Sequence, residues 1–240
     1  MKYANVYNSD YQNGSFDAGL RDYMYLIYKN MGISLLISSI VAFIVGTNIT
    51  LLQFFFSNRL IAFLVQLAPI FFVFSINKEV FSGSVETARN KLYIFSALMG
   101  VSLSTIFVIY TRQNIYNVFL TASATFGVMS LYGYTTKKDL TSWSSFLYMG
   151  VMGIFIASLI NIFVRSATVN LGVSIIGVLL FTLYTAYDVQ SLKRLHTFVG
   201  ITADSKDRIA IMGSLQLYMD FINLFLYMLR VMGSMSNRKE

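Results

Sequence analysis

Seven long apolar stretches with few or no charged residues dominate the sequence and leave few folds open to it. Of the 240 residues, 56% are hydrophobic and 12% are charged, about half the charged fraction of a typical soluble domain. Each stretch is close to the ~20 residues that an α-helix needs to cross the core of a bilayer. They cover approximately residues 30 to 48, 60 to 77, 92 to 111, 115 to 134, 143 to 164, 171 to 191 and 211 to 233. The sequence therefore predicts an all-α integral membrane protein, a bundle of seven transmembrane helices.

The connections between these spans are short, so no soluble domain interrupts the bundle. We expect a polar N-terminal tail at residues 1–29, a seven-helix transmembrane domain at 30–233 and a short C-terminal tail at 234–240. The first thirty residues lack the basic start and short apolar core of a signal peptide. The first span is therefore expected to direct insertion.

Lysine and arginine lie mainly on one side of the predicted bundle. The first, third and fifth loops hold one each, Arg59, Arg112 and Arg165. The N-terminal segment and the second, fourth and sixth loops hold twelve, namely Lys2, Arg21, Lys29, Lys78, Arg89, Lys91, Lys137, Lys138, Lys193, Arg194, Lys206 and Arg208. Basic loops stay in the cytoplasm and meet anionic lipid. We therefore predict a cytoplasmic N-terminus, an external C-terminus, the lipid bilayer as a partner and no nucleic-acid partner.

Asp188 and Asp220 lie within the last two predicted spans. An acid inside a bilayer costs several kcal/mol unless it is protonated, paired or facing water, so such an acid is a functional-site candidate. Polar side chains on the seventh span recur on one helical face, and they are Gln216, Asp220, Asn223, Tyr227 and Arg230. Asp188 shares a face of the sixth span with Thr185 and Ser174. The two acids can therefore converge.

Spacing alone leaves open a structural role for both acids. In that case Asp188 lies at the cytoplasmic interface, and Asp220 bonds to Gln216 or Asn223 and helps to hold the helices together. We expect Asp188 within about one turn of its helix end and Asp220 two to three turns into its own helix. Arg230 lies near the outer end of the seventh span, where a long basic side chain usually anchors at the interface.

The composition removes most catalytic chemistries. The chain has no cysteine and one histidine, His196, so thiolate sites and histidine-rich metal clusters are excluded. A remote alternative is an intramembrane aspartyl protease, because that class resembles this chain in placing acids on the sixth and seventh helices. The sequence lacks that class's glycines before the second acid and has no proline after Pro69. We therefore expect no enzyme activity and no organic cofactor, and a metal site stays unassigned.

Four segments resemble the Bax inhibitor-1 family of multispanning membrane proteins. They are Met99 to Ser104, Tyr132 to Leu140, Ser174 to Val178 with Tyr187-Asp188, and Leu217 to Phe225. The resemblance runs from about residue 60 to residue 233 with matching order and spacing. It implies a seven-helix bundle.

For the calcium-leak members of that family, the resemblance implies a pH-sensitive calcium or cation path governed by Asp188 and Asp220. The two acids would share a proton when the path is closed and separate on deprotonation. Two carboxylates in a low-dielectric environment cannot both ionise cheaply, so the pair would titrate as one unit. The family also has a basic residue near the second loop that latches one aspartate, and Lys78 and Arg89 are its nearest counterparts. The supporting polar stripe would be Gln216, Asn223 and Tyr227.

A second function stays open beside the leak. The resemblance also allows a non-conducting regulatory membrane protein that binds partners such as a membrane protease, a role that other family members have. Calcium and protons are expected as permeant or titrating species in the first case, and a membrane-protein partner in the second. The composition favours a bacterial inner membrane over an endomembrane such as the endoplasmic reticulum.

Overall fold

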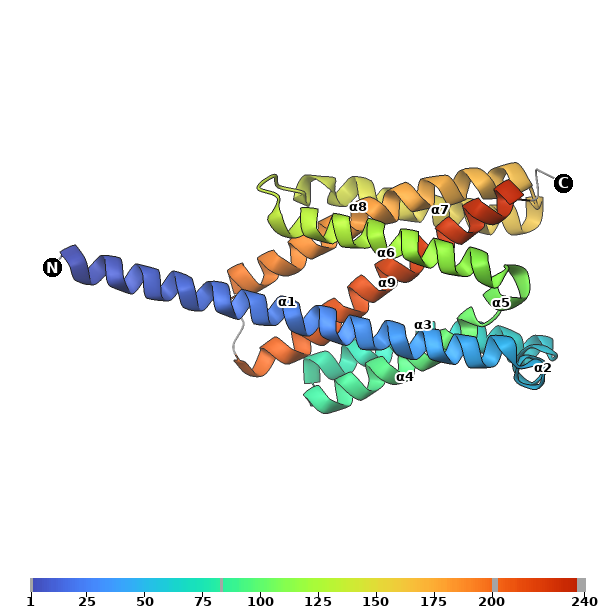
Figure 1. Cartoon of the computed structure of the whole chain (residues 1–240), viewed down its shortest axis with the longest axis horizontal. Coiled ribbons are helices and arrows are strands. Elements are labelled where there is room, and N and C mark those ends of the chain that lie inside the picture. Colours follow the sequence, from blue (N-terminus) through green and yellow to red (C-terminus); the bar gives the residue numbers. More distant parts are fainter. Residues whose placement is uncertain (1, 83, 200–202, 237–240) are drawn as a thin grey trace.

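The computed structural model describes residues 2–82, 84–199 and 203–236, and helices make up nearly all of these ranges (Figure 1). Seven segments are long and apolar enough to cross a membrane, which confirms the predicted all-α fold with seven spans. The elements are α1 (Lys2–Thr47), α2 (Ile49–Phe56), α3 (Arg59–Ser82), α4 (Val85–Leu103), α5 (Ile106–Ile109), α6 (Arg112–Thr135), the 3-10 turn η1 (Thr141–Trp143), α7 (Ser144–Val164), α8 (Ala167–Val199) and α9 (Ala203–Ser236).

Several candidate spans in the structure are longer than the spans predicted from the sequence. The first begins at Ala18 instead of residue 30, the sixth ends at Thr197 instead of residue 191, and the seventh begins at Lys206 instead of residue 211. Basic side chains end a charge-free window without ending a helix, because their long stems can reach the interface. Since α1 is one helix from Lys2 to Thr47, the predicted tail and first span form one element. The division of the chain into tails and bundle stays a prediction.

Because the sixth helix is longer than predicted, Asp188 lies farther from the end of that helix. The expectation that this acid lies within one turn of its helix end is wrong, because α8 continues to Val199. At 1.5 Å per residue, Asp188 lies about 16 Å before that end. Asp220 lies well inside α9, which begins at Ala203. Both acids therefore lie inside candidate membrane spans, Ala167–Thr197 and Lys206–Ser234.

Helix α9 is the central helix of the bundle. Of its most apolar window, 67% is buried, against 11% to 39% in the other six spans. It packs against α1, α3, α4, α6 and α8, and in Figure 1 it crosses the bundle obliquely among them. Helices α3 and α7 are peripheral and expose large apolar side chains such as Phe74 and Phe163. Most of α9 is therefore enclosed by protein, whereas α3 and α7 face lipid.

An odd number of membrane spans is expected to place the two ends of the chain on opposite sides of the membrane, and this topology stays a prediction. Helix α1 begins at one end of the bundle and α9 finishes at the other (Figure 1). We expect green fluorescent protein fused before residue 1 to fluoresce, and alkaline phosphatase fused after residue 240 to be active, because the basic loops stay in the cytoplasm. Fluorescence from fusions at both ends would show that one of the seven helices does not cross.

Candidate functional site

Asp188 on α8 and Asp220 on α9 meet inside the bundle. Their exposed fractions are 3% and 5%, and the side chain of Asp188 is hydrogen-bonded to those of Asp220 and Gln216. Gln216 and Asp220 are four residues apart and share one face of α9. The structure therefore brings together both acids and one member of the polar stripe.

The two acids differ in their hydrogen-bond partners. Asp188 has two side-chain partners, whereas the Oδ2 atom of Asp220 is buried without a partner among the described residues. A hydrogen bond between two carboxyl groups requires a proton on one of them. An unpaired oxygen costs less on a neutral carboxylic acid than on a buried carboxylate. The geometry therefore fits a protonated Asp220 that donates to Asp188, with the Gln216 amide as the second donor.

The opposite face of α9 is held by a hydrogen-bond cluster. The hydroxyl of Tyr218 lies 2.7 Å from Ser38 Oγ on α1, and the Ser38 hydroxyl donates to the carbonyl oxygen of Ser96 on α4 at 2.8 Å. Tyr218 is two residues before Asp220, so the two side chains leave α9 in nearly opposite directions. The cluster fixes α9 to α1 and α4, and the acid faces α8.

Toward the N-terminal end of α8 and the C-terminal end of α9, aromatic rings fill the space between these two helices. The Tyr227 ring stacks on Phe181 with 5.6 Å between centroids and 21° between planes. A Cβ atom at Gly177 would lie 2.5 Å from the Tyr227 ring, so this glycine makes room for the ring. Asn223 lies between Asp220 and Tyr227 along α9 and is half-buried. Tyr227, a member of the polar stripe, therefore packs against α8 at Phe181 and Gly177.

The two basic residues predicted as a latch differ in what the structure describes. The side chain of Lys78 lies outside the described residues. Arg89 is on α4, and its Nε atom is buried without a hydrogen-bond partner within the described ranges. Over those same ranges neither Asp188 nor Asp220 interacts with Arg89. A basic latch on the acids stays a prediction.

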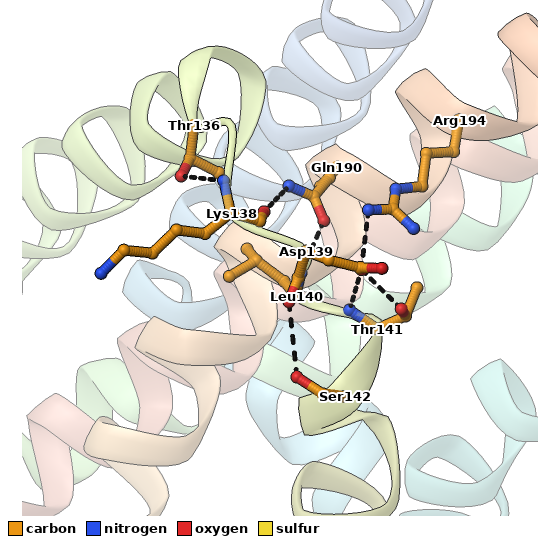
Figure 2. A network of polar contacts seen from close by, with 8 residues as sticks. All are labelled: Thr136, Lys138, Asp139, Leu140, Thr141, Ser142, Gln190 and Arg194. Carbon is orange, nitrogen blue, oxygen red and sulfur yellow. Dashed lines mark hydrogen bonds and ion pairs between the residues drawn. The ribbon is translucent and has the colours of Figure 1, made fainter.

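A second polar network lies toward the C-terminal end of α8, beginning two residues after Asp188. Gln190 Nε2 donates to the Lys138 carbonyl oxygen at 2.7 Å, and Gln190 Oε1 accepts from the Leu140 amide at 2.8 Å. Arg194 Nη2 lies 2.7 Å from Asp139 Oδ1. Figure 2 shows both side chains of α8 reaching the connection between α6 and α7. We call the set of Asp139, Gln190 and Arg194 the loop clamp.

The charge of the loop clamp does not change near neutral pH. Hydrogen bonds from the Thr141 hydroxyl and amide, and then the Arg194 guanidinium, lower the pKa of Asp139 to about 2. A lowered pKa in the folded state means that the ion pair contributes fully above about pH 4 and is lost as the pH falls toward 2. A response of this protein between about pH 6 and 8 therefore has another origin.

Sequence reasoning missed Gln190 because its partners are distant in the chain. The bonded residues are 50 and 52 positions away. The available sequence signal was a glutamine two residues after an intramembrane acid, and in the structure this glutamine is 6% exposed. A buried side-chain amide requires polar partners, and its position in a helix means that they lie on other segments.

Replacing Gln190 by alanine is expected to lower the melting temperature in detergent by about 4 to 8 °C. The change leaves the Leu140 amide and the Lys138 carbonyl without their partner, at a cost of about 2 kcal/mol. The matched control is Gln113→Ala, because Gln113 is exposed and bonds Asn117 on its own helix. Equal melting temperatures for the two variants would contradict the loop clamp.

No group of three or more histidine, cysteine, aspartate or glutamate residues that could hold a metal ion occurs in ranges 2–82, 84–199 and 203–236. The carboxyl pair offers two acids, and Gln216 adds an amide oxygen. Such a set is too small for a dedicated calcium cage, which takes six to eight oxygens. It suits brief contact with a passing cation.

Comparison with known proteins gives one family and several bacterial relatives. The family model described as "Inhibitor of apoptosis-promoting Bax1" matches residues 20–237. A protein of Borreliella burgdorferi is 43% identical over 88% of this chain and 91% of its own length. The inner membrane protein YbhL of Escherichia coli K12 is 39% identical over 90% of this chain and 93% of its own. The protein RP147 of Rickettsia prowazekii is 34% identical over the full length of both chains.

Proposed function

Because the chain belongs to the Bax inhibitor-1 family of multi-pass membrane proteins, we propose that it is a pH-sensitive calcium or cation leak closed by Asp188 and Asp220. The observation that carries this proposal is the direct contact of two buried acids on neighbouring transmembrane helices. The Escherichia coli relative is an inner membrane protein, which supports location in a bacterial inner membrane.

The contact between Asp188 and Asp220 can respond to pH, because the presence of one proton decides whether the two side chains attract or repel each other. With Asp220 protonated, the pair is joined by a hydrogen bond. With both acids ionised, two like charges about 4 Å apart repel by about 4 kcal/mol at an effective dielectric constant of 20. Among the described residues, no lysine or arginine interacts with the pair to offset this repulsion. Deprotonation therefore pushes α8 and α9 apart.

Separation of the two helices would also loosen the packing of Tyr227 against Phe181. Tyr227 on α9 rests on Phe181 and Gly177 of α8, so it loses its support when α8 moves. The freed acids, the Gln216 side chain and Asn223 then supply oxygen atoms along one line toward the outer end. Oxygen ligands of this kind are those that calcium prefers.

Two other titratable groups on α8 require controls. Tyr184 interacts with both acids, but tyrosine titrates near pH 10, outside the range of interest. His196 is also on α8 and stacks on Tyr23 with 5.2 Å between centroids. Histidine ordinarily titrates near pH 6.5, so His196→Gln is the required control for any response between pH 6 and 8.

Calcium entry into liposomes that hold the purified chain tests the proposal. We expect the initial rate to rise between pH 6 and pH 8, by at most about tenfold per pH unit, the limit for a single titrating proton. The rise should persist in His196→Gln. Protein-free liposomes and a calcium ionophore give the lower and upper bounds of the rate. Rates equal to those of protein-free liposomes at every pH would instead support the non-conducting regulatory protein.

A further inference from the structure

The outer end of the bundle carries positive charge and no acid among the described residues. We define this end by the connections from α1 to α3, α4 to α6 and α7 to α8, and by the last turns of α9. Its charged residues in the described part are Arg59, Arg112, Arg165 and Arg230. An anion approaching this end therefore meets attraction from several arginines.

Two cavities meet at one of these arginines. The first has a volume of about 550 Å³, lies between α3, α4, α5 and α9, and is lined mainly by apolar side chains such as Ile70 and Leu226. The second has a volume of about 470 Å³ and contains polar groups of Thr111, Asn114 and Asn170. Ile109, Tyr110 and Arg230 line both cavities.

The guanidinium of Arg230 is held at this junction and stays accessible. It lies 5.1 Å from the centroid of the Tyr227 ring and is hydrogen-bonded to the Tyr227 side chain. The residue is exposed, and neither cavity has an acid in its lining. A planar guanidinium in such a place is suited to bind a phosphate with two parallel hydrogen bonds.

The length of the apolar cavity matches one leaflet of a bilayer. Along α9 its lining runs from Arg230 to Met219, a distance of about 16 Å. Half of the hydrocarbon core of a bilayer is about 15 Å thick. A chain that starts at Arg230 and follows the cavity would therefore end near the middle of the membrane.

We propose that the two cavities form one binding site for an anionic phospholipid of the outer leaflet. The phosphate binds Arg230, the polar headgroup occupies the cavity at the surface, and one acyl chain follows α3 and α9 inward. Such a lipid matches the order of features from the surface inward, which is the polar cavity, the Arg230 guanidinium and the apolar cavity. A soluble anion would use only the polar cavity, and an uncharged hydrocarbon only the apolar one.

Fluorescence quenching by brominated lipid can test the site, because the chain has a single tryptophan, Trp143, which is replaced by phenylalanine. A reporter is then placed by Phe74→Trp in the cavity lining. Its matched control is Phe71→Trp on the same helix. Phe74 and Phe71 have nearly equal exposed fractions of 70% and 68%, and only Phe74 lines the cavity.

In vesicles of phosphatidylcholine, brominated phosphatidylglycerol should quench the Phe74→Trp reporter at about one fifth of the mole fraction that brominated phosphatidylcholine requires. This fivefold preference corresponds to about 1 kcal/mol for one arginine near an anionic headgroup. The Phe71→Trp reporter should show a preference near one. Arg230→Gln should abolish the preference at Phe74→Trp, whereas Arg59→Gln should retain it.

Two results would overturn the site. They are an equal preference at both reporters, which is what a soluble anion confined to the polar cavity would give, and a preference that survives in correctly folded Arg230→Gln protein. Arg230→Lys keeps the charge without the planar fork and should retain a reduced preference, which separates loss of the site from loss of folding.

Discussion

Replacing Asp188 or Asp220 by asparagine is expected to remove most of the pH dependence of calcium flux into liposomes. Asparagine has nearly the shape of aspartate but cannot ionise, so the repulsion between two carboxylates can no longer develop at high pH. The ratio of the initial rates at pH 8 and pH 6 should fall from several-fold in the unmodified chain to about one in either variant. The double variant should add little, because groups that act as one unit are not additive.

The loop clamp supplies a matched acid for this experiment. Asp139→Asn makes the same chemical change at an acid whose pKa is about 2, so its charge is constant between pH 6 and 8. The rate ratio should therefore be unchanged in Asp139→Asn and in His196→Gln. A pH response that survives in Asp188→Asn, or effects that add in the double variant, would show that the acids do not share a proton.

Much of the fold could be predicted from the sequence because the membrane imposes a simple rule. A backbone that crosses a bilayer has to satisfy its hydrogen bonds within the segment, so each apolar stretch of sufficient length becomes a helix. The ends of the helices were less predictable. Arg21, Lys193 and Arg194 lie inside helices, and a window that counts charges stops at them although the helix does not.

Part of the candidate site could be predicted from neighbouring residues in the sequence, and the rest depends on contacts between residues that are far apart in the chain. That Gln216 and Asp220 share a face follows from helical periodicity on one segment. The loop clamp joins Gln190 to backbone groups at least 50 positions away, and the cavities at Arg230 are formed by residues of several helices. A single sequence carries no direct signal for contacts of this range, so these features required the structure.

The second large effect is expected from a substitution at Gly133, where α6 closely approaches α8. A Cβ atom added at Gly133 would overlap the carbonyl oxygen of Ala186. The three atoms nearest to that Cβ position all belong to the backbone of Ala186, so no flexible side chain can move aside. Gly133 is fully enclosed at this point, and Ala186 lies two residues before Asp188 on α8. A larger residue at 133 therefore has to shift the helix that carries the acid.

We expect Gly133→Ala to lower the melting temperature in detergent by about 6 to 12 °C, because overpacking that moves backbone costs about 3 kcal/mol. The matched control is Gly127→Ala on the same helix, where nothing lies within 4 Å of the added atom. That control should be neutral or stabilising by up to about 1 kcal/mol, since alanine favours helix over glycine.

The same displacement should reach the carboxyl pair. Since Ala186 and Asp188 are on one rigid helix, a shift of α8 weakens the contact with Asp220, and calcium flux at pH 6 should rise in Gly133→Ala relative to Gly127→Ala. Flux is compared per folded molecule, at a temperature well below the melting point of both variants. Equal melting temperatures would contradict the close packing of α6 on α8. A lowered melting temperature with unchanged flux at pH 6 would instead separate the packing of α8 from the closure of the path.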